Sequence, residues 1–232
     1  MKIGIDISQT AYKGTGVARY TTSLLKGLLR YDTKNEYILF FSSLRRPVPD
    51  EILKIIENKA EIKRFRIPPS ILSILWNKIH KVPIERFIGK VDLFLSSDWT
   101  EPPAKHAKKI TVIHDLVPYK YPETSDKKII ETHKQRLKWV KKESDLISCN
   151  SNATAADAIE ILGLKKENIR VVYPGVEIFI RFTCKEKITT DKKELTDIDK
   201  GIVKWLVEIM DTSEEPLVGI ATILTMVQKR DN

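Results

Sequence analysis

Residues 2–20 read KIGIDISQTAYKGTGVARY, and their pattern indicates the fold class. Lys2 to Ile7 is a short apolar run, which is typical of a buried strand. A polar stretch with two glycines follows. Apolar residues then recur every three or four positions from Val17 to Leu28, which predicts a helix. A buried strand, a glycine-containing turn and a helix form the opening unit of a parallel α/β sheet.

The same alternation continues along the chain. Short apolar runs predict seven strands at about residues 2–7, 36–41, 61–67, 91–95, 109–113, 145–148 and 169–172. Helical patterns occupy most of the connections, at 47–58, 70–90, 124–142 and 151–162. The sequence therefore predicts an α/β fold: a Rossmann-like, doubly wound parallel sheet over residues 1–177.

Details of two of these helices can also be predicted. In the helix at 124–142 we expect four apolar residues on the inner side: Ile129, Ile130, Leu137 and Val140. Asn150 or Ser151 can cap the helix that follows, and Gly163 ends it.

Residues 178–232 differ from the rest of the chain. The protein carries a net charge of +9, yet this last part has one more acidic than basic residue. Residues 201–210 and 216–227 have helical patterns, whereas 185–200 is polar and poorly periodic. The segment is too short for a second Rossmann domain, so we predict a domain boundary near 178 and a short, partly helical tail.

Composition excludes several classes of protein. The chain is 42% hydrophobic, which suits a packed core, and its apolar runs are too short to span a membrane. The first residues do not resemble a signal peptide, and Cys149 and Cys184 lack metal-site spacing. We expect a cytoplasmic protein in a reducing compartment. The basic residues are spread over several helices without a nucleic-acid-binding motif, so nucleic acid is not an expected partner.

Three loops carry the candidate chemistry, because ligands of open parallel sheets bind beyond the carboxyl ends of the strands. Gly14, Thr15 and Gly16 follow the first strand, with Arg19 one turn later; backbone N–H groups here can approach an anion. Trp99 lies after the fourth strand, among hydroxyl and carboxyl groups suited to a sugar. Without a ligand role, the Gly14–Gly16 loop would be a flexible turn and the Trp99 loop an ordinary proline-stiffened loop.

His114 and Asp115 follow the fifth strand. A histidine there can donate to a sugar hydroxyl, and a neighbouring carboxylate can fix its tautomer. The bland alternative is a surface histidine on a turn. The other histidines share no spacing with it, so no metal site is expected.

These loops belong to a longer series of motifs. In chain order the motifs span residues 14–20, 98–103, 111–116, 121–123, 144–148 and 169–176. Their order and spacing resemble the group 1 (family 4) retaining glycosyltransferases, most closely the mannosyltransferase-type members that build surface polysaccharides. The resemblance covers residues 1–177.

The resemblance implies a GT-B fold of two Rossmann-like domains, of which this chain has the N-terminal, acceptor-side domain. It places Gly16 near the donor phosphates and His114 against the transferred sugar, and Pro174-Gly175-Val176 matches the entry to the second domain. The implied partners are a sugar nucleotide such as GDP-mannose and a glycan or lipid-linked acceptor, with no metal or other cofactor. The family's basic pair and Glu-x7-Glu element have no counterpart after Glu177, so we expect a truncated chain that is weakly active or inactive alone.

Two further interpretations remain open. A non-catalytic sugar- or partner-binding module derived from a glycosyltransferase would keep the same motifs. The basic segment 62–90, with an apolar stripe of Ile71, Ile74, Leu75 and Ile79, can dock on an anionic membrane or a lipid-linked acceptor. Its charges are Lys63, Arg64, Arg66, Lys78, Lys81 and Arg86. The alternative is a helix whose stripe packs on the sheet.

Overall fold

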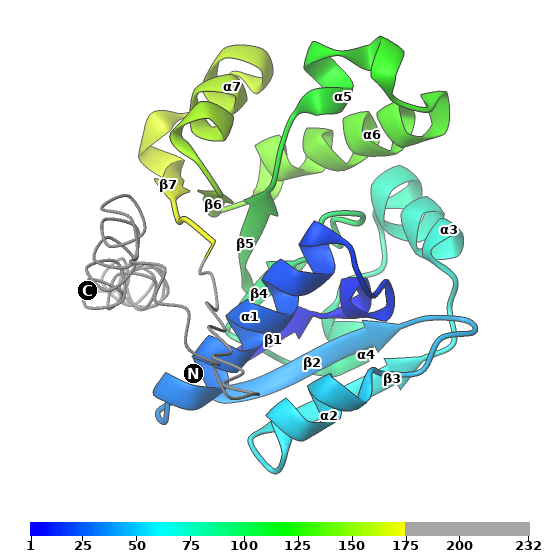
Figure 1. Cartoon of the computed structure of the whole chain (residues 1–232), viewed down its shortest axis with the longest axis vertical. Coiled ribbons are helices and arrows are strands. Elements are labelled where there is room, and N and C mark those ends of the chain that lie inside the picture. Colours follow the sequence, from blue (N-terminus) through cyan, green and yellow to red (C-terminus); the bar gives the residue numbers. More distant parts are fainter. Residues whose placement is uncertain (175–232) are drawn as a thin grey trace, which may run out of the picture. The chain divides into compact units, whose positions relative to one another are not determined.

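The computed structural model describes residues 1–174. Within them, seven strands form one sheet in the order β3-β2-β1-β4-β5-β6-β7, and every neighbouring pair is parallel. The strands are β1 (Lys2–Asp6), β2 (Glu36–Ser42), β3 (Ala60–Phe65), β4 (Leu93–Ser96), β5 (Lys108–Ile113), β6 (Leu146–Cys149) and β7 (Ile169–Val171). The predicted Rossmann-like parallel sheet is confirmed (Figure 1).

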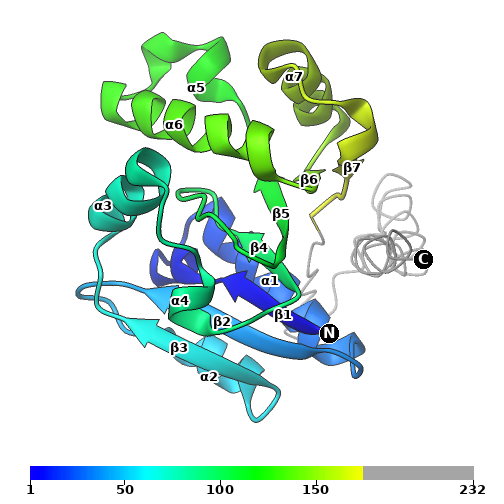
Figure 2. The same cartoon turned by 180° about the vertical axis from the view of Figure 1, so that it is seen from behind.

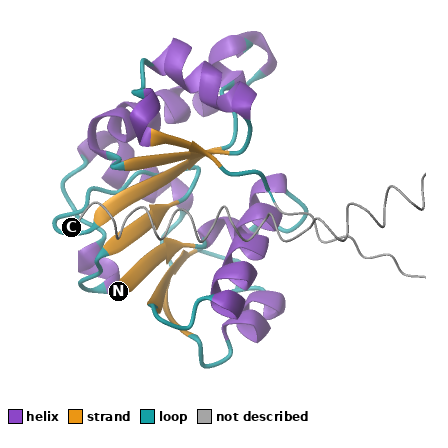
Figure 3. Ribbon diagram, turned by 90° about the vertical axis from the view of Figure 1, so that its left-hand side faces the viewer, coloured by secondary structure: helices purple, strands orange, loops and turns teal. Residues whose placement is uncertain are grey.

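Helices lie on both sides of this sheet, as the view in Figure 3 shows. The α-helices are α1 (Gly16–Tyr31), α2 (Asp50–Ile56), α3 (Pro69–Leu72), α4 (Glu85–Ile88), α5 (Val117–Lys120), α6 (Lys127–Glu143) and α7 (Asn152–Leu162). Shorter or non-α helical turns are η1 (Ser8–Ala11), η2 (Ser73–Ile79), η3 (Pro122–Thr124) and η4 (Lys166–Asn168). From residue 1 to 174, no helix is both long and apolar enough to cross a membrane.

The order of the strands fixes where a ligand can bind. From β1 the chain moves outward through β2 to β3, and it then returns to the other side of β1 to form β4. The connections that leave β1 and β4 therefore run in opposite directions. In open parallel sheets, the carboxyl ends at such a reversal form the ligand-binding crevice.

In the segment 70–90, α3 runs directly into η2, and the short helix α4 follows after a break; α3 and α4 are labelled in Figure 2. η2 is a π-helix that ends at His80, whose backbone is left-handed with φ 52° and ψ 41°. The inward face of this segment is Leu72 and Trp76, which are buried, while Ile71 and Ile74 are about half exposed. Of the predicted stripe, Leu75 packs against the core, whereas Ile71, Ile74 and Ile79 remain about half exposed, so packing on the sheet accounts for only part of the stripe.

α6 differs from its predicted form at its first turn. The helix begins at Lys127, because the Asp126 carboxylate accepts a hydrogen bond from Lys128 N at 2.7 Å. Leu137 and Val140 are buried as expected, but Ile129 is 50% exposed, so its predicted place on the inner side is wrong. The buried face includes Arg136 instead, and hydrophobic periodicity cannot find a buried charged residue.

α7 has the predicted ends. Ser151 Oγ accepts a hydrogen bond from Thr154 N at 3.1 Å, which caps the first turn. Gly163 ends the helix in the left-handed conformation with φ 62°. The predicted domain boundary near 178 and the helices expected at 201–210 and 216–227 lie outside the described residues.

Two apolar clusters stabilise the sheet. One packs α3, η2 and α4 on β2 and β4, and its members are Ile38, Phe40, Leu72, Trp76, Ile84, Ile88, Val91 and Phe94. The other packs α6 and α7 on β5, β6 and β7 and contains Cys149, where burial raises the pKa of the thiol to about 11. At Gly4, a Cβ would lie 2.7 Å from Ile88 Cδ1 and 2.9 Å from Phe94 Cδ2, so a larger residue would force these side chains to shift.

Candidate functional site

The loop after β1 ends in a glycine-containing turn that leads directly into α1. Gly14 has a φ of 89°, which favours glycine, and the Thr15 hydroxyl accepts a hydrogen bond from Ala18 N at 3.2 Å as the N-cap of α1. Gly14, Thr15 and Gly16 are exposed, and so is Arg19 on the first turn of α1. This helix start therefore presents solvent-accessible N–H groups and the positive end of the helix dipole.

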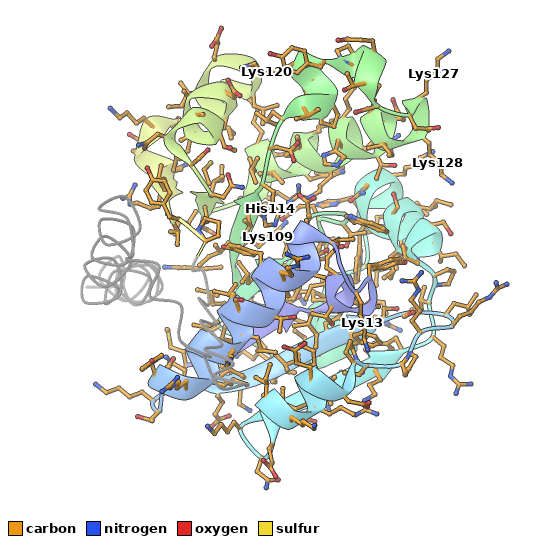
Figure 4. The ribbon with its side chains drawn as sticks, in the orientation of Figure 1. Lys13, Lys109, His114, Lys120, Lys127 and Lys128 are labelled. Carbon is orange, nitrogen blue, oxygen red and sulfur yellow. The ribbon has the colours of Figure 1, made fainter. Side chains whose placement is uncertain are left out.

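His114 follows β5 and lies against α1. Its ring meets the ring of Tyr20 edge to face, with centroids 4.8 Å apart. Figure 4 shows His114 beside the start of this helix. Because Tyr20 lies one helical turn after Gly16, the contact brings the β5 loop to the start of α1. The Thr154 hydroxyl donates to the His114 carbonyl at 3.3 Å and holds the backbone in place.

Burial lowers the pKa of His114, and the positive charge of Arg136 adds to that effect. The carboxylates of Asp98 and Asp115 act in the opposite direction. Because burial is the largest influence, the imidazole is neutral at pH 7. A neutral imidazole can donate one hydrogen bond and accept another, which suits a sugar hydroxyl.

Asp115 does not make the contact that the sequence suggested. Its side chain is exposed, and its Oδ1 accepts a hydrogen bond from Val117 N at 3.0 Å. The carboxylate therefore holds the turn into α5. No hydrogen bond among residues 1–174 joins it to the His114 ring.

Trp99 is 39% exposed and lies on the loop after β4. Its ring contacts Tyr12, with centroids 5.0 Å apart and planes tilted by 40°. The buried amide of Asn77 donates to the Trp99 carbonyl at 2.9 Å and accepts from Glu101 N at 2.9 Å. An interior side chain in η2 therefore holds this loop in place.

A buried ion pair lies behind His114. Arg136 is 1% exposed, and its guanidinium donates to Asp98 Oδ1 at 3.2 Å and to the Val112 carbonyl at 2.9 Å. His133 lies one turn before Arg136 on the same face of α6. Burial lowers the pKa of His133, with Asp98 opposing the shift, so two histidines share the field of this pair.

Asp6 is a further buried acid at the carboxyl end of β1. Its Oδ1 accepts a hydrogen bond from Ser8 N at 2.9 Å. Burial raises the pKa of Asp6, and hydrogen bonds from Ser8 and Ser97 oppose the shift. A carboxyl group with a raised pKa beside a ligand-binding edge is a candidate for a functional role.

The structure thus brings together loops that are distant in the sequence. The loop after β1 contacts the β4 loop through Tyr12 and Trp99, and α1 contacts the β5 loop through Tyr20 and His114. The candidate residues named from the sequence leave out six participants: Asp6, Tyr12, Asn77, His133, Arg136 and Asp98, the last of which was noted only as part of the motif at 98–103. Two of the six lie close in the sequence to candidate residues: Asp98 directly precedes Trp99, and Tyr12 lies two positions before Gly14. Asn77 and Arg136 lie in helices, where nothing in the sequence marks them. No group of three potential metal ligands occurs in the described part of the chain.

Comparison with known proteins identifies the family of the chain. Residues 14–178 match the family model described as Glycosyltransferase Family 4. No curated protein matches the chain. Among solved structures, the crystal structure of Anabaena HepE (Alr3699) in complex with UDP is similar, with a TM-score of 0.43 and 12% sequence identity. The match covers 76% of this chain and 44% of the HepE chain, so the protein spans less than half the length of that structure.

The family match includes every residue that the sequence marked as a candidate, from Gly14 to Asp115. It extends over all the strands of the sheet except β1. On the strength of a match over most of its length, the chain belongs to glycosyltransferase family 4.

Proposed function

We propose that this protein provides the acceptor-side half of a retaining glycosyltransferase. The donor would be a sugar nucleotide, GDP-mannose or a similar compound, and the acceptor a glycan or lipid-linked saccharide used in surface polysaccharide synthesis. The observation that carries the proposal is the position of His114, at the carboxyl end of β5 with its ring against Tyr20 of α1. We also propose that it acts in the cytoplasm.

In this proposal each part of the edge has a task. The neutral His114 imidazole hydrogen-bonds a hydroxyl of the transferred sugar and orients its reacting carbon. The N–H groups at the start of α1 stabilise the negative charge that develops on the leaving diphosphate. Arg19 adds a positive charge on the same turn. Trp99 and Asp115 lie on the loops beyond β4 and β5, where they would line the path of the acceptor.

No step of the proposed reaction passes through a metal ion. The positive charge for the diphosphate comes from the helix start and from basic side chains, including those of a second domain. Transfer measured with EDTA present should therefore match transfer with Mg²⁺ added. A rate that depends on a divalent cation would contradict this part of the proposal.

The chain of 232 residues should be a poor catalyst by itself. Gly14–Gly16 and His114 provide one wall of a site that needs groups from two domains closing on the donor. Losing a single preorganised group on a developing charge typically costs about 10²–10³ in rate. We therefore expect slow transfer at best.

A labelled-donor experiment tests the function. The purified chain is incubated with a panel of radiolabelled sugar nucleotides, GDP-mannose first, and a lipid or polysaccharide acceptor. We expect traces of product that disappear in His114→Ala and persist in His106→Ala, because His106 is an exposed histidine in the β4–β5 connection. Product formed equally by both variants would contradict the role of His114. Acceptor binding without transfer or donor binding would favour a non-catalytic sugar-binding module.

We also propose that the exposed stripe of α3 and η2 contacts an anionic membrane surface. Ile71, Ile74 and Ile79 are 53%, 48% and 51% exposed, and Lys78 and Lys81 are exposed nearby. Large apolar side chains beside cations suit the interface of an anionic bilayer.

Flotation with anionic and zwitterionic vesicles at low and high salt tests this contact. Binding should need anionic lipid, weaken with salt and be lost in Ile71→Ser/Ile74→Ser. The matched control is Ile159→Ser on α7, which removes an apolar side chain that is 37% exposed elsewhere. Binding that is independent of salt, or equally lost in the control, would contradict the proposal.

A further inference from the structure

Three side chains from three loops lie in continuous contact at the carboxyl edge of the sheet, and we call this group the stack. The Arg46 guanidinium lies 4.5 Å from the centroid of the Tyr12 ring, and that ring contacts Trp99 at 5.0 Å. Arg46 follows β2, Tyr12 follows β1 and Trp99 follows β4. Trp99 and Arg46 are exposed and Tyr12 is partly exposed, so the stack reaches solvent.

The stack is built in advance of any ligand. Arg46 donates from its guanidinium to the Ala11 carbonyl at 3.1 Å, and its backbone N–H donates to Ser43 Oγ at 3.0 Å. Trp99 is held through its carbonyl by Asn77. Rings that are already ordered lose little conformational entropy when a ligand packs on them.

The chemistry of these rings selects one kind of ligand. Tyrosine and tryptophan present a large apolar face together with a polar group, so they pack well on surfaces that are apolar on one side and polar around the rim. A pyranose ring is such a surface, because its axial C–H bonds form an apolar face and its hydroxyl groups lie around the edge. The loops of this edge are also those proposed above to meet an acceptor.

The surroundings of the stack are cationic. Lys13, Arg19 and Arg45 are exposed on the same loops and the adjoining helix turn, and within residues 1–174 none of them forms an ion pair. Figure 4 shows Lys13 on the loop between η1 and α1. Two acids on the neighbouring loops are engaged elsewhere, since Asp98 pairs with Arg136 and Asp115 holds the turn into α5. An anion would therefore be attracted to this side of the rings.

We propose that Tyr12, Trp99 and Arg46 form a subsite for an acidic saccharide, with a sugar ring on the aromatic faces and its carboxylate or phosphate group on Arg46. The inference deepens the proposed function, because it rests on this edge receiving the acceptor and names the acceptor's chemical class. The anionic group can belong to a uronic acid or to the diphosphate of a lipid-linked sugar. The test separates these two sources.

Ligand-observed NMR and titration of the full chain test the subsite. The probes are a neutral oligomannoside, an oligogalacturonate of the same length and a short-chain prenyl-diphosphate saccharide. At least one anionic probe should bind about tenfold more tightly than the neutral one, which corresponds to a single cation contact of moderate strength. The probe that binds identifies the source of the anionic group.

Variants of the stack assign the binding to it. Arg46→Ala should reduce the affinity for the anionic probe to that for the neutral probe, whereas Arg46→Lys should retain part of the difference in affinity. Trp99→Ala should weaken all probes about tenfold, and Trp99→Phe, which keeps a ring, should weaken them less. Loss of the Trp99 indole N–H signal in Trp99→Phe identifies the resonance that should shift in the wild-type chain on binding.

A cation–aromatic pair away from the stack provides the control. Arg30 lies 5.3 Å from the centroid of the Tyr31 ring at the C-terminal end of α1, at the opposite edge of the sheet, and Tyr31 is 55% exposed. Arg30→Ala and Tyr31→Ala should leave binding of all probes unchanged.

Several results would overturn the subsite: binding of no probe, equal binding of neutral and anionic probes, unchanged binding in Arg46→Ala or Trp99→Ala, or equal weakening in the control pair. This outcome is distinct from failure of the proposed function. His114-dependent transfer without saccharide binding at the stack would reject the subsite alone. Binding at the stack without transfer would reject the catalytic function alone.

Discussion

Two loops of the candidate site are held in place in different ways. The β4–β5 connection is fixed from inside, where Glu101 is fully buried and pairs with Lys109 Nζ at 2.9 Å, and Asn77 bonds to the Trp99 and Glu101 backbones. The loop after β1 is exposed from Lys13 to Gly16 and is held by short-range bonds such as Thr15 Oγ1 to the Tyr12 carbonyl at 3.0 Å.

The difference indicates which side of the site can move. A buried network rigidifies the residues it connects, because breaking one bond leaves another group unsatisfied. An exposed glycine loop held by local bonds opens at low cost in free energy. The Trp99 side is therefore expected to be the more rigid of the two, and the Gly14–Gly16 side the one that moves more readily.

Among the variants that test this contrast, Lys109→Met should have the largest effect on stability. The change leaves the Glu101 carboxylate buried without its cationic partner, so we expect a loss of about 3–5 kcal/mol in the free energy of unfolding. Urea denaturation measures it. The double variant Lys109→Met/Glu101→Gln should recover part of that loss. A loss below about 1 kcal/mol in the single variant would mean that the network does not fix this loop.

Asn77→Ala should have the next largest effect. It removes the partners of the Trp99 carbonyl and of Glu101 N, which we expect to cost about 1–3 kcal/mol. Asn77→Asp keeps an acceptor for Glu101 N but loses the donor to the Trp99 carbonyl. Its loss of unfolding free energy should therefore reflect only the missing hydrogen bond to Trp99. Both variants should shift the Trp99 indole signal. An unshifted Trp99 indole signal together with unchanged stability would contradict the role of Asn77 in holding this loop.

The glycine loop should tolerate change more readily. Thr15→Ala removes the N-cap of α1 and should cost about 1 kcal/mol, and Gly14→Ala should cost about 1–2 kcal/mol because of its positive φ. Gly16→Ala should be near neutral, since a Cβ there meets nothing within 4 Å. Thermal denaturation of the three variants should rank them in this way. A loss in Gly16→Ala equal to that in Gly14→Ala would reject the explanation by backbone conformation.

The smallest predicted effect is on the pH dependence of stability. Burial lowers the folded-state pKa of His114 and His133, so between the folded and unfolded values the unfolded chain binds more protons. The stabilising contribution is complete above the unfolded pKa of about 6.5 and decreases as the pH falls through that value toward the folded one. Urea midpoints between pH 5 and 8 should show this decrease. It should be smaller in His114→Asn, and an unchanged slope there would contradict the prediction.

The sheet could be predicted from the sequence because buried parallel strands are short apolar runs. Each observed strand lies within two residues of its predicted position at the start, and the caps of α7 were identified from Ser151 and Gly163. The segment 70–90 was harder, since η2 ends in a left-handed residue that is not a glycine. Tertiary contacts hold His80 in this conformation: its ring stacks on Trp139 and forms a hydrogen bond with Glu143.

The site could be predicted only in part, for a related reason. Strand ends locate the loops, so Gly14, Trp99 and His114 could be named from their positions after strands. Asn77 and Arg136 act from helices that reach these loops through the core, at sequence separations of 22 and 38 residues from Trp99 and Asp98. Such contacts depend on how helices pack, which local patterns do not encode.

The edge strand β3 has a consequence for the behaviour of the protein in concentrated solution. An exposed sheet edge can pair with the edge of another molecule and begin aggregation. No residue of β3 is fully buried, Glu61 and Arg64 are exposed, and Lys63 pairs with Glu61 along the strand. A second chain that added a strand here would have to place its backbone among these charges. In the sequence, the basic residues at 63 and 64 suggested attraction to a membrane. Their charges on the edge strand also disfavour strand pairing between two copies of the chain.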